Sequence, residues 1–429
     1  MKEIGALKEA DSLPMEDDRV EDELVKQVLE GCDRVGLDRE AGLKILNVLV
    51  TESKRVQGIR GRTSPVPIFS KALELQRKRV KLIRLDVGEP DFAPPQAVLE
   101  ACSEALFAHK THYTESQGIP ELTEALVGYL ARKHGFKASE GEVAVTPSGR
   151  FAVYAALASV VGELESVIVP EPNWPAYRDS LQQLGAKAVA VHTSIEEGWT
   201  PSIKGIERAI RPNTKAIILS YPNNPTGRVI SKDLFRQIVE LSDDRGLTVI
   251  SDEIYNEYTP KPSPSVLETT PKKFILTSSF SKTWAMTGFR IGYSVSSKET
   301  TSKIARMISL MFTSVPEFIQ WGAIRALDAD GDVRRNVAEM SRRIDVACKE
   351  LDGIDGLEYV RPDGGMYVFP ELSKGRGSGE SFAQRLLDAG VSVTPGILFG
   401  DYGDFFRISL GQQEHAIVEG IRRMGRFLS

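Results

Sequence analysis

Cysteine and histidine are scarce in this sequence, and long apolar runs are absent. Its 429 residues contain only Cys32, Cys102 and Cys348, far apart along the chain, and five histidines without an HExxH or other metal-ligand spacing. This scarcity excludes a disulfide framework and a CxxC metal site, and it favours a location in the reducing cytoplasm. We therefore expect no metal in the functional site.

Signals for membrane insertion and secretion are also lacking. No apolar run reaches the roughly 18 residues that a membrane span requires, and the opening Met1-Lys2-Glu3 is not followed by the apolar core of a secretory signal. We expect no membrane association. The net charge of −5 argues against nucleic-acid binding as the main activity.

Acidity is concentrated at the N-terminus. Residues 1–50 carry seven Lys or Arg and 13 Asp or Glu, a net charge of −6 against −5 for the whole chain. Acidic clusters at 16–18 and 21–23 predict an exposed, partly disordered start. Apolar residues at helical spacing around 24–29 and 43–50 predict two helices. Residues 1–57 are thus interpreted as an acidic helical extension that packs on the main body, serves regulation or partner binding, or forms an inert tail.

Strand and helix patterns alternate through most of the remaining chain. A helix at 69–79 and a strand at 82–87 are predicted first. Apolar runs then predict seven strands, at 142–146, 166–169, 186–191, 215–221, 247–251, 274–279 and 291–295. Helical stretches such as 232–245 separate several of them. The pattern is typical of an α/β protein with a mostly parallel, helix-covered sheet, in which ligands bind beyond the carboxyl ends of the strands.

The C-terminal part has a different pattern. It is helical from about residue 319 to 351, and short strands are predicted near 358–359, 366–369, 391–393 and 405–410. Hydrophobic residues make up 41% of the chain, enough for two cores. We predict a large domain over 109–319 and a smaller α+β domain formed by 58–108 together with 320–429.

One lysine stands in unusual surroundings. Lys282 follows the apolar strand at 274–279 and lies between Ser281 and Thr283, close in sequence to Trp284. A lysine at a strand end is most often a solvated surface residue. Here the neighbouring residues do not form a charged face, and desolvation would lower the pKa of the amine and make it nucleophilic. A second cation, Arg290, follows eight residues later.

Further motifs follow the other predicted strands. They are GEPDF at 88–92, TPSGR at 146–150, NNPTG at 223–227, SDEIY at 251–255, SFSKT with GFRIGY between 279 and 293, and FRISLG at 406–411. Taken together and in this order, they resemble the class I/II aminotransferases, which are pyridoxal phosphate (PLP) enzymes of fold type I, and most of all the aspartate aminotransferase family. The resemblance covers about residues 64–429. It implies a large domain with a seven-stranded, mostly parallel sheet and a smaller α+β domain.

The resemblance implies a role for each motif in holding PLP. Lys282 would form the Schiff base with the cofactor, Asp252 would pair with the pyridine nitrogen, and Asn224 and Tyr255 would contact the phenolic oxygen. Trp174 would stack on the ring. The phosphate would be held by a set of six residues: Ser148, Gly149, Arg150, Ser279, Arg290 and, from the neighbouring subunit, Tyr113. Sharing Tyr113 in this way requires a homodimer.

Several of these residues have a plainer explanation. A tryptophan such as Trp174 is by default a packing residue, and an aspartate at a strand end such as Asp252 is often a helix N-cap. Tyr113 would ordinarily be a surface or core residue. Phe151 stands where the family commonly has Gln or Glu, which leaves the hydrogen bonding near the phosphate turn open. The Asn224–Pro225 bond is a candidate for a cis peptide.

Substrate contacts are implied by the same resemblance. Arg407 would clamp the substrate α-carboxylate, unless it forms a structural salt bridge, and Gly88, Trp174 and Asn224 would lie beside it. Arg150 stands where one group of aspartate aminotransferases has a lysine for the distal carboxylate. The alternative interpretation is that Arg150 is a surface residue.

The sequence thus predicts a PLP-dependent aminotransferase that moves an amino group between an L-amino acid and a 2-oxo acid such as 2-oxoglutarate. Lys282 would transfer the proton, and aspartate or glutamate is the favoured donor. Alanine, aromatic and branched-chain substrates stay open, as does a β-lyase or oxidase of the same fold type. A transcription regulator with an aminotransferase-like domain is the remote alternative, since the leader is short and acidic rather than a basic DNA-binding domain.

Overall fold

A seven-stranded sheet forms the centre of the molecule. The computed structural model describes residues 18–57, 71–72, 74–75, 77 and 82–428. The sheet order is β2-β8-β7-β6-β5-β3-β4, and only β8 runs antiparallel to its neighbours. The strands span β2 Val143–Thr146, β3 Ser166–Glu171, β4 Lys187–His192, β5 Thr214–Ser220, β6 Thr248–Asp252, β7 Phe274–Ser279 and β8 Gly292–Ser296. The α/β fold with a mostly parallel seven-stranded sheet is confirmed, and each predicted strand of the series lies within a few residues of an observed one.

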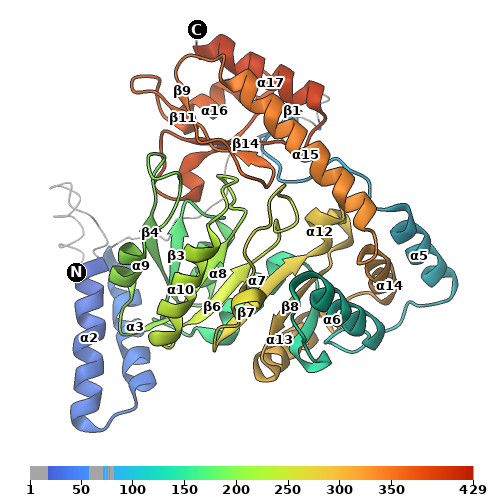
Figure 1. Cartoon of the computed structure of the whole chain (residues 1–429). Coiled ribbons are helices and arrows are strands. Elements are labelled where there is room, and N and C mark those ends of the chain that lie inside the picture. Colours follow the sequence, from blue (N-terminus) through green and yellow to red (C-terminus); the bar gives the residue numbers. More distant parts are fainter. Residues whose placement is uncertain (1–17, 58–70, 73, 76, 78–81, 429) are drawn as a thin grey trace.

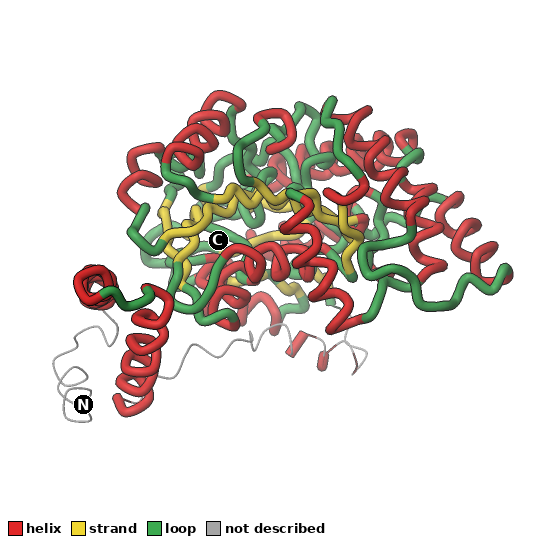
Figure 2. Tube along the Cα trace, turned by 90° about the horizontal axis from the view of Figure 1, so that it is seen from below, coloured by secondary structure: helices red, strands yellow, loops and turns green. Residues whose placement is uncertain are grey.

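Helices cover both faces of this sheet, as Figure 2 shows. They are α5 Gln96–Phe107, α6 Pro120–His134, α7 Gly149–Val160, α8 Ala176–Gln183, α9 Ile203–Ala209, α10 Lys232–Asp244, α11 Val266–Thr269, α12 Phe280–Thr283, α13 Lys298–Phe312 and α14 Glu317–Ala326, with short 3₁₀ turns η1 Glu140–Glu142 and η2 Thr287–Phe289. Ser231 illustrates why one of them begins where it does. Its hydroxyl accepts from the backbone N–H of Leu234 and caps α10.

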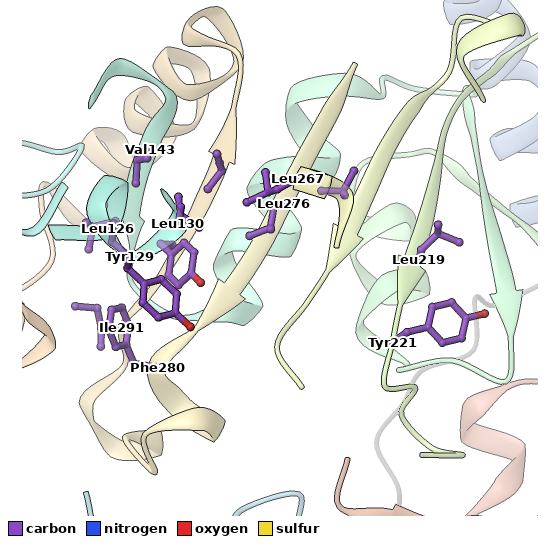
Figure 3. Close-up of a cluster of buried hydrophobic side chains, with 14 of the residues drawn as sticks. Leu126, Tyr129, Leu130, Val143, Leu219, Tyr221, Leu267, Leu276, Phe280 and Ile291 are labelled. Atoms are coloured by element: carbon purple, nitrogen blue, oxygen red, sulfur yellow. The ribbon is translucent and has the colours of Figure 1, made fainter. Parts of the chain in front are cut away.

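The sheet and its helices bury two apolar cores, one on each face. Inner strands such as β3 and β5 contain continuous apolar runs, Val167–Val169 and Ala216–Leu219, because a parallel sheet covered on both faces buries both sides of such a strand. Leu276 of β7 and Leu219 of β5 lie in one core with Leu126 of α6, and Figure 3 shows these side chains. Ile218 and Ile275, next along the same strands, lie in the opposite core with Leu157 of α7.

A second region is built from short strands and three helices. Its strands are β1 Ile83–Arg84, β9 Leu357–Glu358, β10 Tyr367–Val368, β11 Glu371–Leu372, β12 Val391–Ser392, β13 Thr394–Pro395 and β14 Phe406–Ser409. Its helices are α15 Asp330–Leu351, α16 Gly379–Asp388 and α17 Glu414–Leu428, with the turn η3 Gly396–Phe399. They enclose a separate core that includes Phe382, Ile408 and Met424. The long helix α15 runs from this region towards α5 and α14 (Figure 1).

The strand predicted at 82–87 is shorter than expected. Only Ile83–Arg84 forms β1, because its partner β12 is itself two residues long. The helix predicted at 69–79 lies largely outside the described residues.

α5 contributes Val98 and Cys102 to the core of the large sheet. The predicted domain boundaries stay a prediction.

Two N-terminal helices form a hairpin at one side of the body (Figures 1 and 2). They are α2 Asp18–Val35 and α3 Arg39–Gln57, and Asp38 caps the second by accepting from the N–H of Ala41 at 2.9 Å. Apolar side chains of both helices pack against Leu164, so the hairpin contacts the main body. The expected disordered start lies outside the described residues. Over the described ranges, no helix has both the length and the apolar character to cross a bilayer.

Candidate active site

A cavity of about 270 Å³ lies where the carboxyl ends of β5, β6 and β7 meet the second region. Ser220, Asp252 and Ser279 are the last residues of these three strands, and all three line it. Parallel strands bring their carboxyl ends to one edge of a sheet, so loops far apart in sequence converge there. The second region contributes Tyr367 of β10 and Arg407 of β14 to the opposite wall.

Lys282 lies in the short helix α12, which directly follows β7. Its ammonium group donates to the carbonyl oxygen of Gly88, and its backbone carbonyl accepts from the Tyr258 hydroxyl at 2.9 Å. Burial, opposed by Glu89 and assisted by Arg407 and Arg290, lowers the pKa of the Lys282 amine to about 8. More of the amine is therefore uncharged near neutral pH than in an ordinary lysine, and it can act as nucleophile or base.

Asp252 is buried at the end of β6. Its Oδ2 accepts from the Tyr177 hydroxyl at 2.6 Å, and its Oδ1 from the backbone N–H of Ile254 at 3.3 Å. Burial raises the pKa of this carboxyl to about 6, although both hydrogen bonds act in the other direction. A cation placed beside Asp252 would offset the free-energy cost of burying the ionised carboxylate. The site therefore favours a ligand that carries a protonated nitrogen.

Arg407 and Asn224 are joined across the cavity. Arg407 Nη1 donates to Asn224 Oδ1 at 2.9 Å, and Nη2 donates to the carbonyl of Asp86 at 2.7 Å. The Nε atom of Arg407 is buried and has no hydrogen-bond partner among the described residues. A buried cation with an unused donor fits a carboxylate ligand. Because Asn224 accepts with its oxygen, its amide NH₂ group is left as the donor.

The N-terminus of α7 forms an anion-binding corner. Gly149 begins this helix, and a Cβ at its position would come within 2.8 Å of the Ser279 Cβ, so only glycine allows the approach. Free N–H groups at a helix start favour a phosphate. The Ser279 side chain lies next to Gly149, and Arg290 is a further cation of the cavity lining. The residues here therefore suit the phosphate of a cofactor.

Arg150 and Trp174 are stacked. The guanidinium carbon of Arg150 lies 4.6 Å from the centre of the Trp174 ring, and both line the cavity. Burial lowers the pKa of Arg150, with Asp179 opposing it. The contact holds a cation beside the aromatic wall.

Two predicted cofactor residues do not line the cavity. The Ser148 hydroxyl is buried and accepts from the N–H of Phe151 at 3.2 Å, so it caps α7. Tyr113 is 85% exposed on the surface. All the other predicted site residues line the cavity: Gly88, Gly149, Arg150, Trp174, Asn224, Asp252, Tyr255, Ser279, Lys282, Arg290 and Arg407.

The prediction of a cis bond at Asn224–Pro225 is wrong. In the described residues, the cis peptide bonds precede Pro172 and Pro222. The turn at 223–227 closes instead through Asn223, whose Oδ1 accepts from the N–H and the hydroxyl of Thr226.

Sequence reasoning missed two tyrosines of the site. Tyr177 donates to Asp252, and the hydroxyl of Tyr367 lies 2.6 Å from that of Tyr255. Tyr367 lies in a strand predicted at 366–369, whereas no element is predicted at Tyr177, which lies in α8. In either place, the sequence does not indicate which way a tyrosine side chain points. Only a hydroxyl partner on another element distinguishes them from core residues.

Comparisons with known proteins agree on one family. The family model described as aminotransferase class I and II matches residues 80–423. The aspartate/prephenate aminotransferase of Thermus thermophilus is 35% identical over 384 residues, covering 88% of this chain and 98% of the relative. A probable aspartate/prephenate aminotransferase of Aquifex aeolicus is 34% identical over 392 residues, covering 87% and 99%. Among solved structures, the Thermus thermophilus aspartate aminotransferase with maleate superposes with a TM-score of 0.81 at 33% identity, covering 86% of this chain and 100% of that one.

The raised pKa of Asp252 predicts a pH-dependent stability. Between pH 4 and 6 the unfolded chain has released this proton while the folded chain keeps it, so the free energy of unfolding falls as pH rises, and the penalty persists above pH 6. Asn cannot ionise. Without cofactor, Asp252→Asn should therefore be more stable than the parent by roughly 2 kcal/mol at pH 7.5 and about equal near pH 4.

Urea unfolding at both pH values measures this difference. Asp355→Asn, an exposed position, serves as the control and should show the same difference at both. A stability difference for Asp252→Asn that does not change with pH would contradict the assignment.

Proposed function

Because this chain belongs to the class I and II aminotransferase family and is an aminotransferase, we propose that it moves the amino group in the cavity around Lys282, with PLP as the cofactor. Enzymes of this family are typically PLP-dependent. The observation that carries the proposal is the position of Lys282, whose amine has a lowered pKa, in one cavity with buried Asp252 and buried Arg407. When bound, PLP supplies an electron sink for the electrons that the substrate Cα releases with its proton.

The chain's own residues fit that cofactor. Asp252 accepts from the protonated ring nitrogen, which a buried carboxylate keeps charged. Asn224 and Tyr255 donate to the phenolic oxygen, and Trp174 covers the ring. The start of α7, with Ser279 and Arg290, holds the phosphate. Ser148 contributes by capping α7 with its hydroxyl rather than by lining the cavity.

Lys282 serves first as the attachment point and then as the base. With PLP and an amino acid bound, the uncharged Lys282 amine would take up the proton of the substrate Cα as a general base and would give it back as a general acid. A pKa lowered to about 8 suits both directions of this transfer near neutral pH. Arg407, whose buried guanidinium lines the cavity, holds the α-carboxylate by a charge-assisted hydrogen bond.

The favoured substrates are aspartate or glutamate with 2-oxoglutarate. Arg150 supports this choice because its guanidinium is held at the cavity wall by Trp174, within reach of a second carboxylate. The relatives named for aspartate and prephenate support the same choice. Alanine, aromatic or branched-chain donors, and elimination or oxidation on the same lysine, are the competing assignments. Assays for free ammonia and for peroxide distinguish elimination and oxidation from amino transfer. A DNA mobility shift tests the remote alternative, a transcription regulator with an aminotransferase-like domain.

The enzyme is proposed to act in the cytoplasm. Cys32, Cys102 and Cys348 are all free and buried, which suits a reducing compartment. Cell fractionation that finds the protein outside the cytoplasm would contradict this location.

Removing the lysine tests the central proposal. Lys282→Ala should lower amino transfer by about 10³-fold or more, because both the attachment point and the base are lost. The first measurement is the absorbance spectrum of the parent protein with PLP, before and after single amino acids are added without an oxo acid. Lys303→Ala, on the exposed side of α13, serves as the control.

The spectra distinguish the outcomes. A shift towards the pyridoxamine form with aspartate or glutamate supports both the lysine chemistry and the dicarboxylate preference. A shift with other amino acids alone keeps the aminotransferase and discards that preference. A parent protein that binds no PLP would overturn the proposal.

Replacing Arg150 tests the substrate preference. Arg150→Ala should raise KM for aspartate by about tenfold or more, since a charge-assisted hydrogen bond contributes roughly 1.5–3 kcal/mol, and leave KM for alanine within twofold. Arg208→Ala, at an exposed position of α9, is the control and should change neither the KM for aspartate nor the KM for alanine. Steady-state kinetics with aspartate and with alanine measures these KM values. Intact turnover of aspartate in Arg150→Ala would contradict the proposed role of Arg150.

We also propose a homodimer with shared sites. Tyr113 lies beside the exposed end of α13, because Thr114 N donates to Ser314 Oγ at 3.2 Å and Ser116 Oγ to the carbonyl of Thr313 at 2.7 Å. The nearby Leu310, Met311 and Phe312 are exposed as well. An apolar surface of this kind marks an interface. A second copy seated on it would receive Tyr113 at its phosphate corner.

Mixing two defective variants tests this arrangement. Tyr113→Ala and Lys282→Ala should each be impaired at limiting PLP, but mixed dimers contain one site with both an intact Lys282 and the partner's intact Tyr113. We expect the mixture to recover activity. Mixing Lys282→Ala with Arg407→Leu is the control and should recover none, since both side chains serve their own chain. No recovery in the first mixture, or a monomer in sedimentation equilibrium, would refute the shared site.

A further inference from the structure

Tyr367 stands at the junction of the cavity's main groups. It is fully buried in β10, lines the cavity, and meets three other parts of the wall. Its hydroxyl lies 2.6 Å from the Tyr255 hydroxyl, and the Arg407 guanidinium lies 4.4 Å from the centre of its ring. A Cβ on Gly88 would come within 2.1 Å of the same hydroxyl, so this oxygen is packed against the Gly88 backbone.

The direction of the Tyr255–Tyr367 hydrogen bond follows from proton counting. From the geometry alone, either hydroxyl is an acceptable donor. Each phenol has one proton and can accept through its lone pairs. In the proposed function, Tyr255 donates its proton to the phenolic oxygen of the cofactor, so it can only accept from Tyr367. Cofactor binding therefore fixes Tyr367 as the donor.

We propose that Tyr367 is a positioning residue with two separable roles: its hydroxyl donates to Tyr255 and strengthens that residue's hydrogen bond to the cofactor oxygen, and its ring supports the Arg407 carboxylate clamp. This inference rests on the proposed function and goes beyond it. It assigns a role to a side chain that none of the sequence motifs contains.

The hydroxyl role depends on the low dielectric of the site. The groups that face the Tyr255 hydroxyl are Tyr367, Arg407 and Asp252. Burial holds the pKa of Tyr255 well above its ordinary value, so Tyr255 stays a protonated donor at every relevant pH. In a dry chain of hydrogen bonds, accepting one bond makes a hydroxyl a stronger donor in the next. The donation from Tyr367 thus passes to the cofactor oxygen.

The ring role depends on the faces of Arg407. The guanidinium carbon lies 4.4 Å from the centre of the Tyr367 ring and 5.0 Å from the centre of the Phe399 ring. Its Nη atoms already donate to Asn224 and Asp86. Aromatic faces attract the cation and keep its plane fixed. The guanidinium, which lines the cavity, is thereby held in place for the substrate carboxylate.

Two substitutions separate the roles. Tyr367→Phe removes the hydroxyl and keeps the ring, whereas Tyr367→Leu removes both. The readout for the hydroxyl is the pH midpoint at which the PLP-loaded protein changes its absorbance, as the nitrogen joining Lys282 to the cofactor loses its proton. That nitrogen donates to the phenolic oxygen while protonated. Once that proton is lost, the hydrogen bond from Tyr255 stabilises the negative charge on the phenolic oxygen. A weaker Tyr255 hydrogen bond therefore disfavours the deprotonated form and raises the pH midpoint.

The expected shifts differ in size. Tyr255→Phe should raise the midpoint by about one pH unit, and Tyr367→Phe by roughly 0.3 units, since coupling adds about a third to a bond at most. Tyr367→Phe should leave KM for the amino donor within twofold, and Tyr367→Leu should raise it about fivefold or more. In the double variant, the midpoint should equal that of Tyr255→Phe alone.

A buried tyrosine elsewhere provides the matched control. Tyr402 donates to the carbonyl of Thr193 at 2.9 Å and does not line the cavity, so Tyr402→Phe should keep the parent midpoint and KM. A parent-like midpoint in Tyr367→Phe, or additive shifts in the double variant, would overturn the hydroxyl role and leave the proposed function standing. Failure of the parent to hold PLP on Lys282 would instead reject the proposed function.

Discussion

Burial of charge is the constraint on which the rest of this structure depends. Lys282, Asp252 and Arg407 surround one cavity, and burial moves the pKa of the lysine down and that of the aspartate up. An isolated buried charge is expensive in free energy. In the proposed function, a ligand that carries the opposite charges offsets this cost. The site is therefore best understood as one part of an ion-paired assembly.

Two structural regions divide the work of building that cavity. The large sheet delivers Asp252 from the end of β6, and Lys282 from the short helix α12 that directly follows the adjacent strand β7. The region of short strands delivers Arg407 and Tyr367 on the paired strands β14 and β10. The carbonyl of Asp86 accepts from Arg407, and that of Gly88 from Lys282. The segment after β1 thus contacts groups from both regions.

Tyrosine hydroxyls connect the charged groups without adding charge. Tyr177 donates to Asp252, Tyr258 donates to the backbone of Lys282, and Tyr255 faces Tyr367. Each has a rigid ring that fills the core and a polar end that meets one partner. Such side chains orient ionisable groups at little entropic cost, because few torsions must be fixed. The proposed proton direction from Tyr367 to Tyr255 is one consequence of that arrangement.

The sequence by itself determined the α/β fold, the approximate strands of the large sheet and most of the cavity lining. Apolar runs of strand length are a local property, and motifs such as SDEIY and NNPTG follow those runs directly, so Asp252 and Asn224 could be placed from the chain alone. Only the tertiary structure decided which side chains face one another. The Ser148 hydroxyl accepts from the N–H of Phe151 and does not line the cavity, whereas Tyr177 and Tyr367 line it and meet partners on other elements. Pairing across distant segments depends on how two cores pack against each other, and no local pattern of residues encodes that distance.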